Sequence, residues 1–383
     1  MKKVYFDSAA TTQVRSEVIR CITEVLKTEY GNPSSTHSYG RSSKSLLENA
    51  RKEIAKILGV TAAEIIFTSG GTEADNLILN SCVRDLKVAR IITSKIEHHA
   101  VLYCIQELQD KHGIEVEYVN LEAECGSVDY DDLESRLQHS NAKTLVSLMH
   151  VNNEVGNVLD IDRTARLCKQ YDALFHSDTV QSVGHYEIDF SVIPVDFAAV
   201  AAHKFHGPKG AGFAFIRKNT GLKPLIFGGE QERGLRAGTE AVYAIAGMAE
   251  ALKIAYQNLD KEKKYITELK DYFKQKLRDE IPGVKFNGAC DDNNKSTYTL
   301  LNVCLPISEE KALMLLFQLD LKGIACSKGS ACQSGSTKGS HVLNAILPES
   351  DLKKPSIRFS FSSFNTKEEV DYVVDVLKEF ITA

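Results

Sequence analysis

The sequence lacks the features that mark several large classes of protein. No apolar run approaches the roughly 20 residues of a membrane span, and the opening MKKVYFDSAATT contains no apolar stretch of signal-peptide length. The net charge of −5 gives no basic footprint for nucleic acid. No repeat or low-complexity tract is visible. We therefore expect a cytoplasmic protein that binds neither membrane nor nucleic acid directly.

Paired cysteines are also missing. The chain has nine cysteines, an odd number, and none belongs to a Cys-x-x-Cys pair. This pattern argues against a disulfide framework or a structural zinc site and favours a reducing cytosol. His98 and His99 are adjacent, but no nearby set of cysteines or carboxylates completes a metal site. We therefore expect no metal ion.

What the sequence does contain is an alternation of short apolar strands and amphipathic helices from about residue 15 to about 250. Such alternation predicts an α/β fold with a large, mostly parallel sheet that helices cover on both faces. The strands are expected at 64–68, 89–94, 116–121, 144–150, 173–178, 196–202 and 212–218. The clearest helices are expected at 42–59, 72–86 and 162–172.

The pattern changes near residue 250, where one or two long helices are expected over 241–281. A smaller α+β unit follows, with elements expected at 297–306, 309–323, 356–363 and 366–380. The FDSAATT loop near the N-terminus has no local partner and is expected to pack on this unit. We therefore predict a large α/β domain at 13–258 and a small α+β domain formed by 1–12 and 259–383.

Lys204 is the first candidate for chemistry. The apolar run DFAAVAA (196–202) delivers it into a turn rich in glycine and proline. Desolvation at the end of a buried strand disfavours a charged ammonium and makes an amine nucleophilic, so an aldehyde cofactor held as a Schiff base is the obvious use. Taken alone, Lys204 reads more simply as a surface lysine, and its companions must decide.

Asp178 ends another apolar strand, about one helix–strand unit before Lys204. Parallel neighbouring strands would bring both side chains to one crevice at their carboxyl ends. A buried carboxylate needs a cation or a donor, and a pyridinium N–H supplies both. Gln181 lies within reach of the same ligand, and His98 could lay its imidazole flat on an aromatic cofactor. Strand-end aspartates and core histidines are also common in structural roles.

The segment FTSGGTEADN (67–76) follows a strand and opens a helix. The backbone N–H groups of Gly71 and Thr72, together with the helix dipole, could hold a phosphate there. The lysine of a P-loop is missing from this segment. An ordinary N-terminal cap made by Thr72 and Glu73 is the alternative interpretation.

A second centre is Cys332, in the glycine- and serine-rich stretch CSKGSACQSGSTKGS (326–340). A cysteine on such a loop could swing, and Lys328 and Lys338 would favour its thiolate. A surface cysteine in a flexible linker is the alternative. Cys326, six residues earlier, is expected to be structural.

Candidate anion-binding residues occur in three other segments of the chain. Arg358 alternates with apolar residues in SIRFS (356–360), and an inward arginine of this kind suits a carboxylate. Asn153 is a strand-end polar group, and Arg236 and Thr239 lie in a glycine-rich loop. These residues add a carboxylate site and a further anion site to the prediction.

Together these motifs resemble the cysteine desulfurases, which depend on pyridoxal 5′-phosphate (PLP) and belong to the class-V aminotransferases of fold type I. The resemblance runs essentially from end to end. It is specific, because aminotransferases of the same fold lack the Ser-Ala-Cys loop that surrounds Cys332. The motifs occur in family order as FDSAATT, GNPSSTHSYGR, SGGTEADN, EHHA, HVNNEVG, HSDTVQS, HKFHGPKG, ERGLRAGTE, GSACQSGS and SIRFS.

The resemblance implies a role for each reactive group. Lys204 matches the Schiff-base lysine, Asp178 the partner of the pyridine nitrogen, and Gln181 the residue near the phenolic oxygen. His98 matches the histidine that stacks on the ring and is expected to move protons as well. Cys332 matches the nucleophile that accepts sulfur, on a loop whose spacing is similar to that of the long-loop subgroup serving iron–sulfur cluster assembly.

The resemblance also implies the binding residues. Thr72 and His203 match phosphate contacts, with Gly71 at the same helix start, and Asn153 and Arg358 match the substrate carboxylate site. Thr239 matches a phosphate contact lent by a second subunit, which implies a homodimer.

Some positions depart from the family pattern. Ala201 stands where a serine of the phosphate cup is common, so one donor is missing and weaker cofactor retention is expected. Ala74 replaces another serine, and Glu240 stands where asparagine is frequent. None of these changes removes a group that the chemistry requires.

The implied function is conversion of L-cysteine to L-alanine, with the sulfur carried as a persulfide on Cys332 to an iron–sulfur scaffold or another acceptor. Two alternatives stay open at this point. One is a selenocysteine lyase or another class-V PLP enzyme, and the other is a degenerate, non-catalytic scaffold in sulfur delivery.

Overall fold

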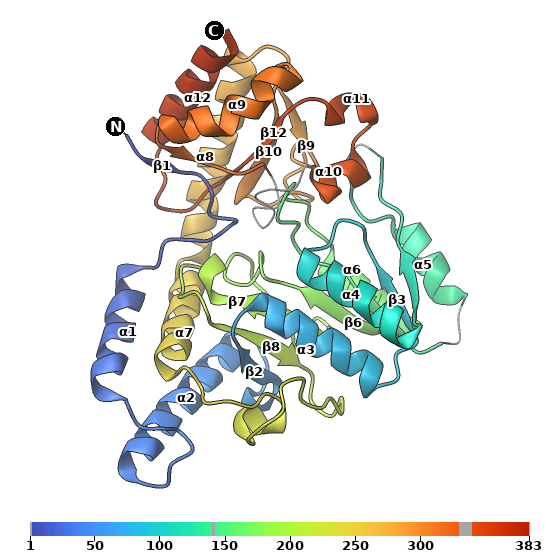
Figure 1. The fold of residues 1–383 in the computed structure, drawn as a ribbon, viewed down its shortest axis with the longest axis vertical. Coiled ribbons are helices and arrows are strands. Elements are labelled where there is room, and N and C mark those ends of the chain that lie inside the picture. The colour runs from blue at the N-terminus through green and yellow to red at the C-terminus, as the bar shows by residue number, and fades with distance from the viewer. Residues whose placement is uncertain (1, 124, 140–141, 329–338, 383) are drawn as a thin grey trace.

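The computed structural model describes residues 2–123, 125–139, 142–328 and 339–382 (Figure 1). Its centre is a seven-stranded sheet in the order β2-β8-β7-β6-β5-β3-β4. The strands are β2 Ile65–Thr68, β3 Arg90–Thr93, β4 Glu115–Tyr118, β5 Thr144–Ser147, β6 Leu174–Asp178, β7 Phe197–Ala201 and β8 Gly212–Ile216. Every neighbouring pair is parallel except the two that involve β8. The predicted mostly parallel sheet is therefore confirmed.

Helices cover both faces of this sheet, as the side-chain alternation along β7 demonstrates. Phe197 and Ala199 pack in one apolar cluster with α3 and α4, whereas Ala198 and Val200 pack in another with α2, α6 and α7. In Figure 1, α3 crosses the near face of the sheet. The helices of this part are α1 Ser16–Thr28, α2 Ser38–Ile57, α3 Gly71–Arg84, α4 His99–His112, α5 Tyr130–Gln138, α6 Ile161–Gln170 and α7 Val242–Gln257.

A smaller antiparallel sheet, in the order β12-β10-β9, carries the later part of the chain, and β1 pairs in parallel with β11 beside it. Phe6 is fully buried here and meets the rings of Phe273, Phe359 and Phe361. The strands are β1 Val4–Tyr5, β9 Lys285–Asn287, β10 Leu300–Cys304, β11 Ile324–Ala325 and β12 Ser356–Ser360. The helices are α8 Leu259–Glu280, α9 Glu309–Leu321, α10 His341–Ile346, α11 Glu349–Leu352 and α12 Lys367–Thr382.

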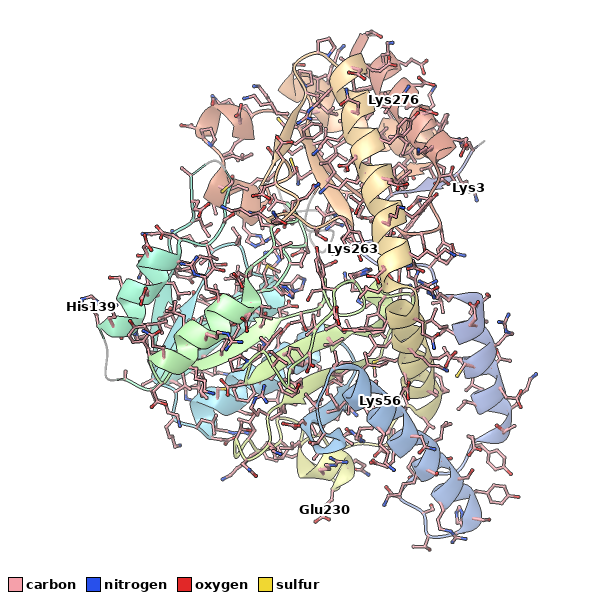
Figure 2. All side chains as sticks on the ribbon, turned by 180° about the vertical axis from the view of Figure 1, so that it is seen from behind. Lys3, Lys56, His139, Glu230, Lys263 and Lys276 are labelled. Atoms are coloured by element: carbon pink, nitrogen blue, oxygen red, sulfur yellow. The ribbon has the colours of Figure 1, made fainter. Side chains whose placement is uncertain are left out.

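Two long helices connect the parts. Helix α7 ends at Gln257 and α8 begins at Leu259, so the predicted helical stretch breaks at Asn258. Figure 2 shows them from behind as a column along the molecule, with Lys263 and Lys276 marking α8. The N-terminal residues lie with the C-terminal elements, because β1 pairs with β11. The exact division into domains stays a prediction.

Several boundaries differ from the sequence-based expectations, and two of the differences concern α2 and β5. Helix α2 begins at Ser38 rather than at 42, because the ring of His37 accepts a hydrogen bond from Gly40 N and caps the helix earlier. The strand expected at 144–150 ends at Ser147. Within the described residues, no helix combines the length and apolar character that a membrane crossing needs.

Candidate functional site

A cavity of about 230 Å³ lies at the carboxyl ends of β6 and β7. Ligands of open α/β sheets bind at this edge, because the strands end there and loops supply the polar groups. The cavity gathers most of the residues that the sequence singled out. Those that line it are Gly71, Thr72, His98, Asn153, Asp178, Gln181, His203, Lys204 and Arg358.

Lys204 closes the short 3-10 turn that follows β7. Its Nζ donates hydrogen bonds to the carbonyls of Ala9, at 2.6 Å, and Ala10, at 2.9 Å. Thr12 donates through both its N–H and its hydroxyl to the carbonyl of His203. The N-terminal segment therefore lies against the turn and forms one wall of the cavity.

Asp178 is the last residue of β6, which pairs in parallel with β7 as predicted. Its side chain is 5% exposed, and Oδ1 accepts a hydrogen bond from Val180 N at 2.9 Å. Burial raises the pKa of Asp178, while His98 and Lys204 act in the opposite direction. A cationic donor in the cavity would relieve the cost of this buried carboxylate.

His98 is the N-terminal cap of α4, and its Nδ1 accepts a hydrogen bond from Ala100 N at 3.1 Å. Burial lowers the pKa of His98, with Asp178 opposing the change. The neutral ring therefore keeps its proton on Nε2. The ring of His99 packs against two other rings. Its centroid lies 4.7 Å from that of Tyr103, on which it stacks, and 4.4 Å from that of His341.

The start of α3 could hold an anion. Its N-cap, Gly70, makes no side-chain capping bond, so the helix start relies on other acceptors for its first N–H groups. A Cβ on Gly71 would lie 2.5 Å from a methyl group of the cavity residue Val180, which explains the glycine. His203 lies beside this region, and burial lowers its pKa to about 4.

Arg358, in the middle of β12, occupies the opposite wall and is 2% exposed. One terminal nitrogen donates to the carbonyl of Asn153 at 2.7 Å, and the other donates to Asp7 Oδ1 at 2.8 Å. The same Asp7 oxygen accepts a hydrogen bond from Ser327 Oγ at 2.9 Å. The inward arginine therefore already meets an anion from its own chain.

Four residues that the sequence singled out lie apart from this cavity or outside the described residues. Thr239 is exposed and does not line the cavity, and Arg236 nearby pairs with Glu73 at 2.8 Å. Cys332 and Lys338 lie outside the described residues.

Cys326 is described, and burial raises its pKa to about 12, which suits the structural role expected of it. Among the described residues, no three His, Cys, Asp or Glu side chains are arranged to hold a metal ion.

Sequence reasoning missed Asp7, Asp75 and Met149, although all three belong to the site. Asp75 had a detectable signal, because it lies one helical turn after Gly71 and Thr72 and so shares their face. Asp7 belongs to the FDSAATT motif, but nothing in the sequence specifies its pairing with Arg358, which is 351 positions away in the chain.

Comparisons with known proteins identify the family of this chain. The class-V aminotransferase family profile matches residues 4–373. Cysteine desulfurase IscS of Dictyoglomus turgidum is 43% identical over 382 residues, which cover 99% of this chain and 95% of that protein. A solved NifS-like protein superposes with a TM-score of 0.90 at 35% identity, and another, from Rickettsia africae, with 0.87 at 32%, each covering 100% of both chains. The chain therefore belongs to the PLP-dependent cysteine desulfurases of the class-V aminotransferase family.

Proposed function

We propose that this protein removes the sulfur of L-cysteine, releases L-alanine, and carries the sulfur as a persulfide on Cys332. The step balances without a further reactant: the thiol of Cys332 and L-cysteine become a Cys332 persulfide and L-alanine. The observation that carries the proposal is the convergence of Lys204, Asp178, His98 and Arg358, from four separate segments, on one cavity. An amine, a carboxylate, an imidazole and a guanidinium together suit amino-acid chemistry on a pyridine aldehyde.

The residues present fit PLP. Asp178 is a buried hydrogen-bond acceptor and would pair with a protonated pyridine nitrogen. The start of α3 at Gly71 and Thr72, with His203 beside it, suits the phosphate. When bound, PLP supplies an electron sink for the electron pair released at the substrate Cα. Lys204 would hold the aldehyde end through its amine.

Gln181 and His98 would fix the orientation of the cofactor ring. Gln181 is buried and its Nε2 donates to the Ala9 carbonyl at 2.9 Å, which holds the side chain at the cavity. The capping bond occupies Nδ1 of His98, so Nε2–H is the hydrogen-bond donor that the ring can offer to another group. We assign to His98 ring stacking and proton movement, and to Lys204 removal of the proton from the substrate Cα.

Arg358 and Asn153 would bind the carboxylate of the substrate. Because one guanidinium nitrogen of Arg358 already contacts Asp7, the incoming carboxylate must share or exchange this contact. This arrangement orients the amino acid without offering it an uncompensated charge. Cys332 then attacks the substrate sulfur as a thiolate.

The wider setting belongs to the same proposal. We infer a cytoplasmic homodimer in which Thr239 of one copy reaches the phosphate of the other, in keeping with its exposed position. The sulfur acceptor would be an iron–sulfur scaffold or another thio-cofactor protein.

The test is a turnover assay on protein loaded with PLP. With L-cysteine and a thiol reductant, alanine and sulfide should form in equal amounts. A bound cofactor with no alanine would move the reaction to another amino acid. Failure to take up PLP at all would contradict the cofactor site.

A further inference from the structure

A second buried carboxyl lines the cavity beside Asp178. Asp75, on the first turns of α3, is 1% exposed, and its Oδ1 lies 3.3 Å from Nε2 of His176. Across the described residues, neither of these two atoms makes a hydrogen bond of standard geometry, and each is the other's ion-pair contact. A buried polar atom without a partner is costly, so this contact must satisfy both atoms.

His176 extends the contact into the sheet. It lies on β6 two residues before Asp178, so the two side chains project from the same face of the strand. Its ring is fully buried, and its Nδ1 lies 2.9 Å from Oγ of Ser147, the residue that pairs with it on β5. A continuous polar chain therefore runs from Asp75 through His176 to Ser147.

The charges around Asp75 decide where a proton resides in this chain. The titratable groups that contact Asp75 or act on its charge include His176, Asp178, Glu97 and Cys104, and Lys204 and Arg358 line the same cavity. The charges named as acting on Asp75 are the carboxylates of Asp178 and Glu97. Burial and the neighbouring carboxylates raise the pKa of Asp75 well above its ordinary value, and burial lowers the pKa of His176 to about 3. Two adjacent buried carboxyls avoid ionising together.

We propose that Asp75 is a positioning residue: its protonated carboxyl donates to Nε2 of His176, whose Nδ1–H donates to Ser147, so that the negative charge beside the cofactor ring falls on Asp178. The two carboxyls thereby differ in role because they differ in partners, one neutral and one charged. The inference rests on the proposed function, since the charge of Asp178 matters to a pyridine ring bound beside it.

The tautomer of His176 tests the proposal in full-length protein without PLP. Nitrogen-15 NMR of labelled histidines distinguishes a proton on Nδ1 from one on Nε2, and H176Q identifies the signal among the 11 histidines. We expect Nδ1–H in the parent protein. A neutral ring with Nε2–H would place the charge on Asp75, and a doubly protonated ring would make the pair ionic; either result would overturn the proposal.

Two variants separate charge from structure. In D75N the amide can still donate to Nε2, so the Nδ1–H tautomer should persist, whereas in D75A the donor is lost and both tautomers should appear. The PLP dissociation constant should stay near the parent value in both variants, because Asp178 still carries the negative charge in each. Equal losses in D75N and D75A would show that the charge of Asp75 is needed, which contradicts the proposal.

The two proposals fail in different ways. If the parent protein does not take up PLP, the proposed function is wrong, while the tautomer in the cofactor-free protein still reports on Asp75 and His176. If PLP binds but His176 carries its proton on Nε2, the function stands and this inference falls.

Discussion

The two walls of the cavity treat their charged groups differently. On the sheet wall, Asp178 is buried with one backbone N–H as its donor, and burial raises its pKa. On the opposite wall, Arg358 is equally buried, yet both terminal nitrogens have partners at 2.7 and 2.8 Å. On the sheet wall Asp178 could pair with a cationic N–H of a ligand, with His98 and Lys204 nearby, whereas on the other wall Arg358 already pairs with Asp7.

This difference teaches how binding energy is divided. A cofactor that brings a cationic N–H to Asp178 relieves a cost that the cofactor-free protein bears. A substrate carboxylate at Arg358 instead replaces or shares contacts that already exist, so its net gain is smaller. We therefore expect tight binding of the cofactor and weaker, exchangeable binding of the amino acid.

Removing the amine on the sheet wall should have the largest effect. Lys204→Ala should lower kcat/KM for L-cysteine by more than about 1,000-fold, because both the cofactor linkage and the proton acceptor are lost. The absorbance of bound PLP should change as well. Lys209→Ala, an exposed lysine in the same turn, is the matched control and should behave as the parent. Comparable activity in both variants would contradict the role of Lys204.

Replacing the arginine on the opposite wall by lysine should have the second-largest effect. Arg358→Lys cannot reach the Asn153 carbonyl and Asp7 together, so kcat/KM should fall about 100-fold, mainly through KM. PLP content should stay at the parent level, and Arg166→Lys on the surface is the control. Loss of PLP in Arg358→Lys would show that the two walls are not separate.

Glu97, which precedes His98 in the chain, should make the stability of the protein depend on pH. Its oxygens accept from Ser94 Oγ and Met149 N, and burial raises its pKa from 4.5 to about 8. Because the folded-state pKa is raised, the stability due to the protonated form is complete below about pH 4.5 and is lost as pH rises through about 8. Thermal unfolding of the cofactor-free protein should therefore show a steeper decline over this range than in Glu97→Gln. Parallel pH profiles would refute this.

Neutralising Asp7 tests whether this carboxylate competes with the substrate for Arg358. Asp7→Asn removes the anion that occupies Arg358, so the dissociation constant for L-alanine should fall about fivefold. Asp7→Glu, which keeps the charge, should not show this gain. Weaker alanine binding in Asp7→Asn would mean that Asp7 orients Arg358 rather than competing with the substrate.

The smallest effect is expected at Ala201, which lines the cavity at the end of β7. Ala201→Ser adds a hydroxyl donor beside the predicted phosphate site, and the PLP dissociation constant should fall severalfold, on the order of 1 kcal/mol. Equilibrium dialysis of the cofactor would measure this change. Weaker retention in the variant would show that the missing serine has been replaced by other contacts.

The same contrast explains what sequence reasoning could reach. Lys204, Asp178 and His98 each follow a predicted strand, and the end of a parallel strand specifies their position. The antiparallel direction of β8 was within reach too, because the link from Ala201 to Gly212 is too short for a parallel crossover.

The second wall was not accessible in this way. The FDSAATT loop was expected to pack on the C-terminal unit, but no local pattern specifies the pairing of Asp7 with Arg358. The order of strands in the sheet is likewise a property of packing between distant elements. The roles of the residues that line the cavity stay predictions.

The central claim is that sulfur passes from L-cysteine to Cys332. Its most direct test is the intact mass of PLP-loaded protein after one equivalent of L-cysteine without reductant, with peptide mapping and alanine quantified in the same sample. We predict one added sulfur atom on the peptide that contains Cys332 for each alanine released, and none in Cys332→Ser. Alanine formed with no sulfur on Cys332, or with sulfur on another cysteine, would contradict the account.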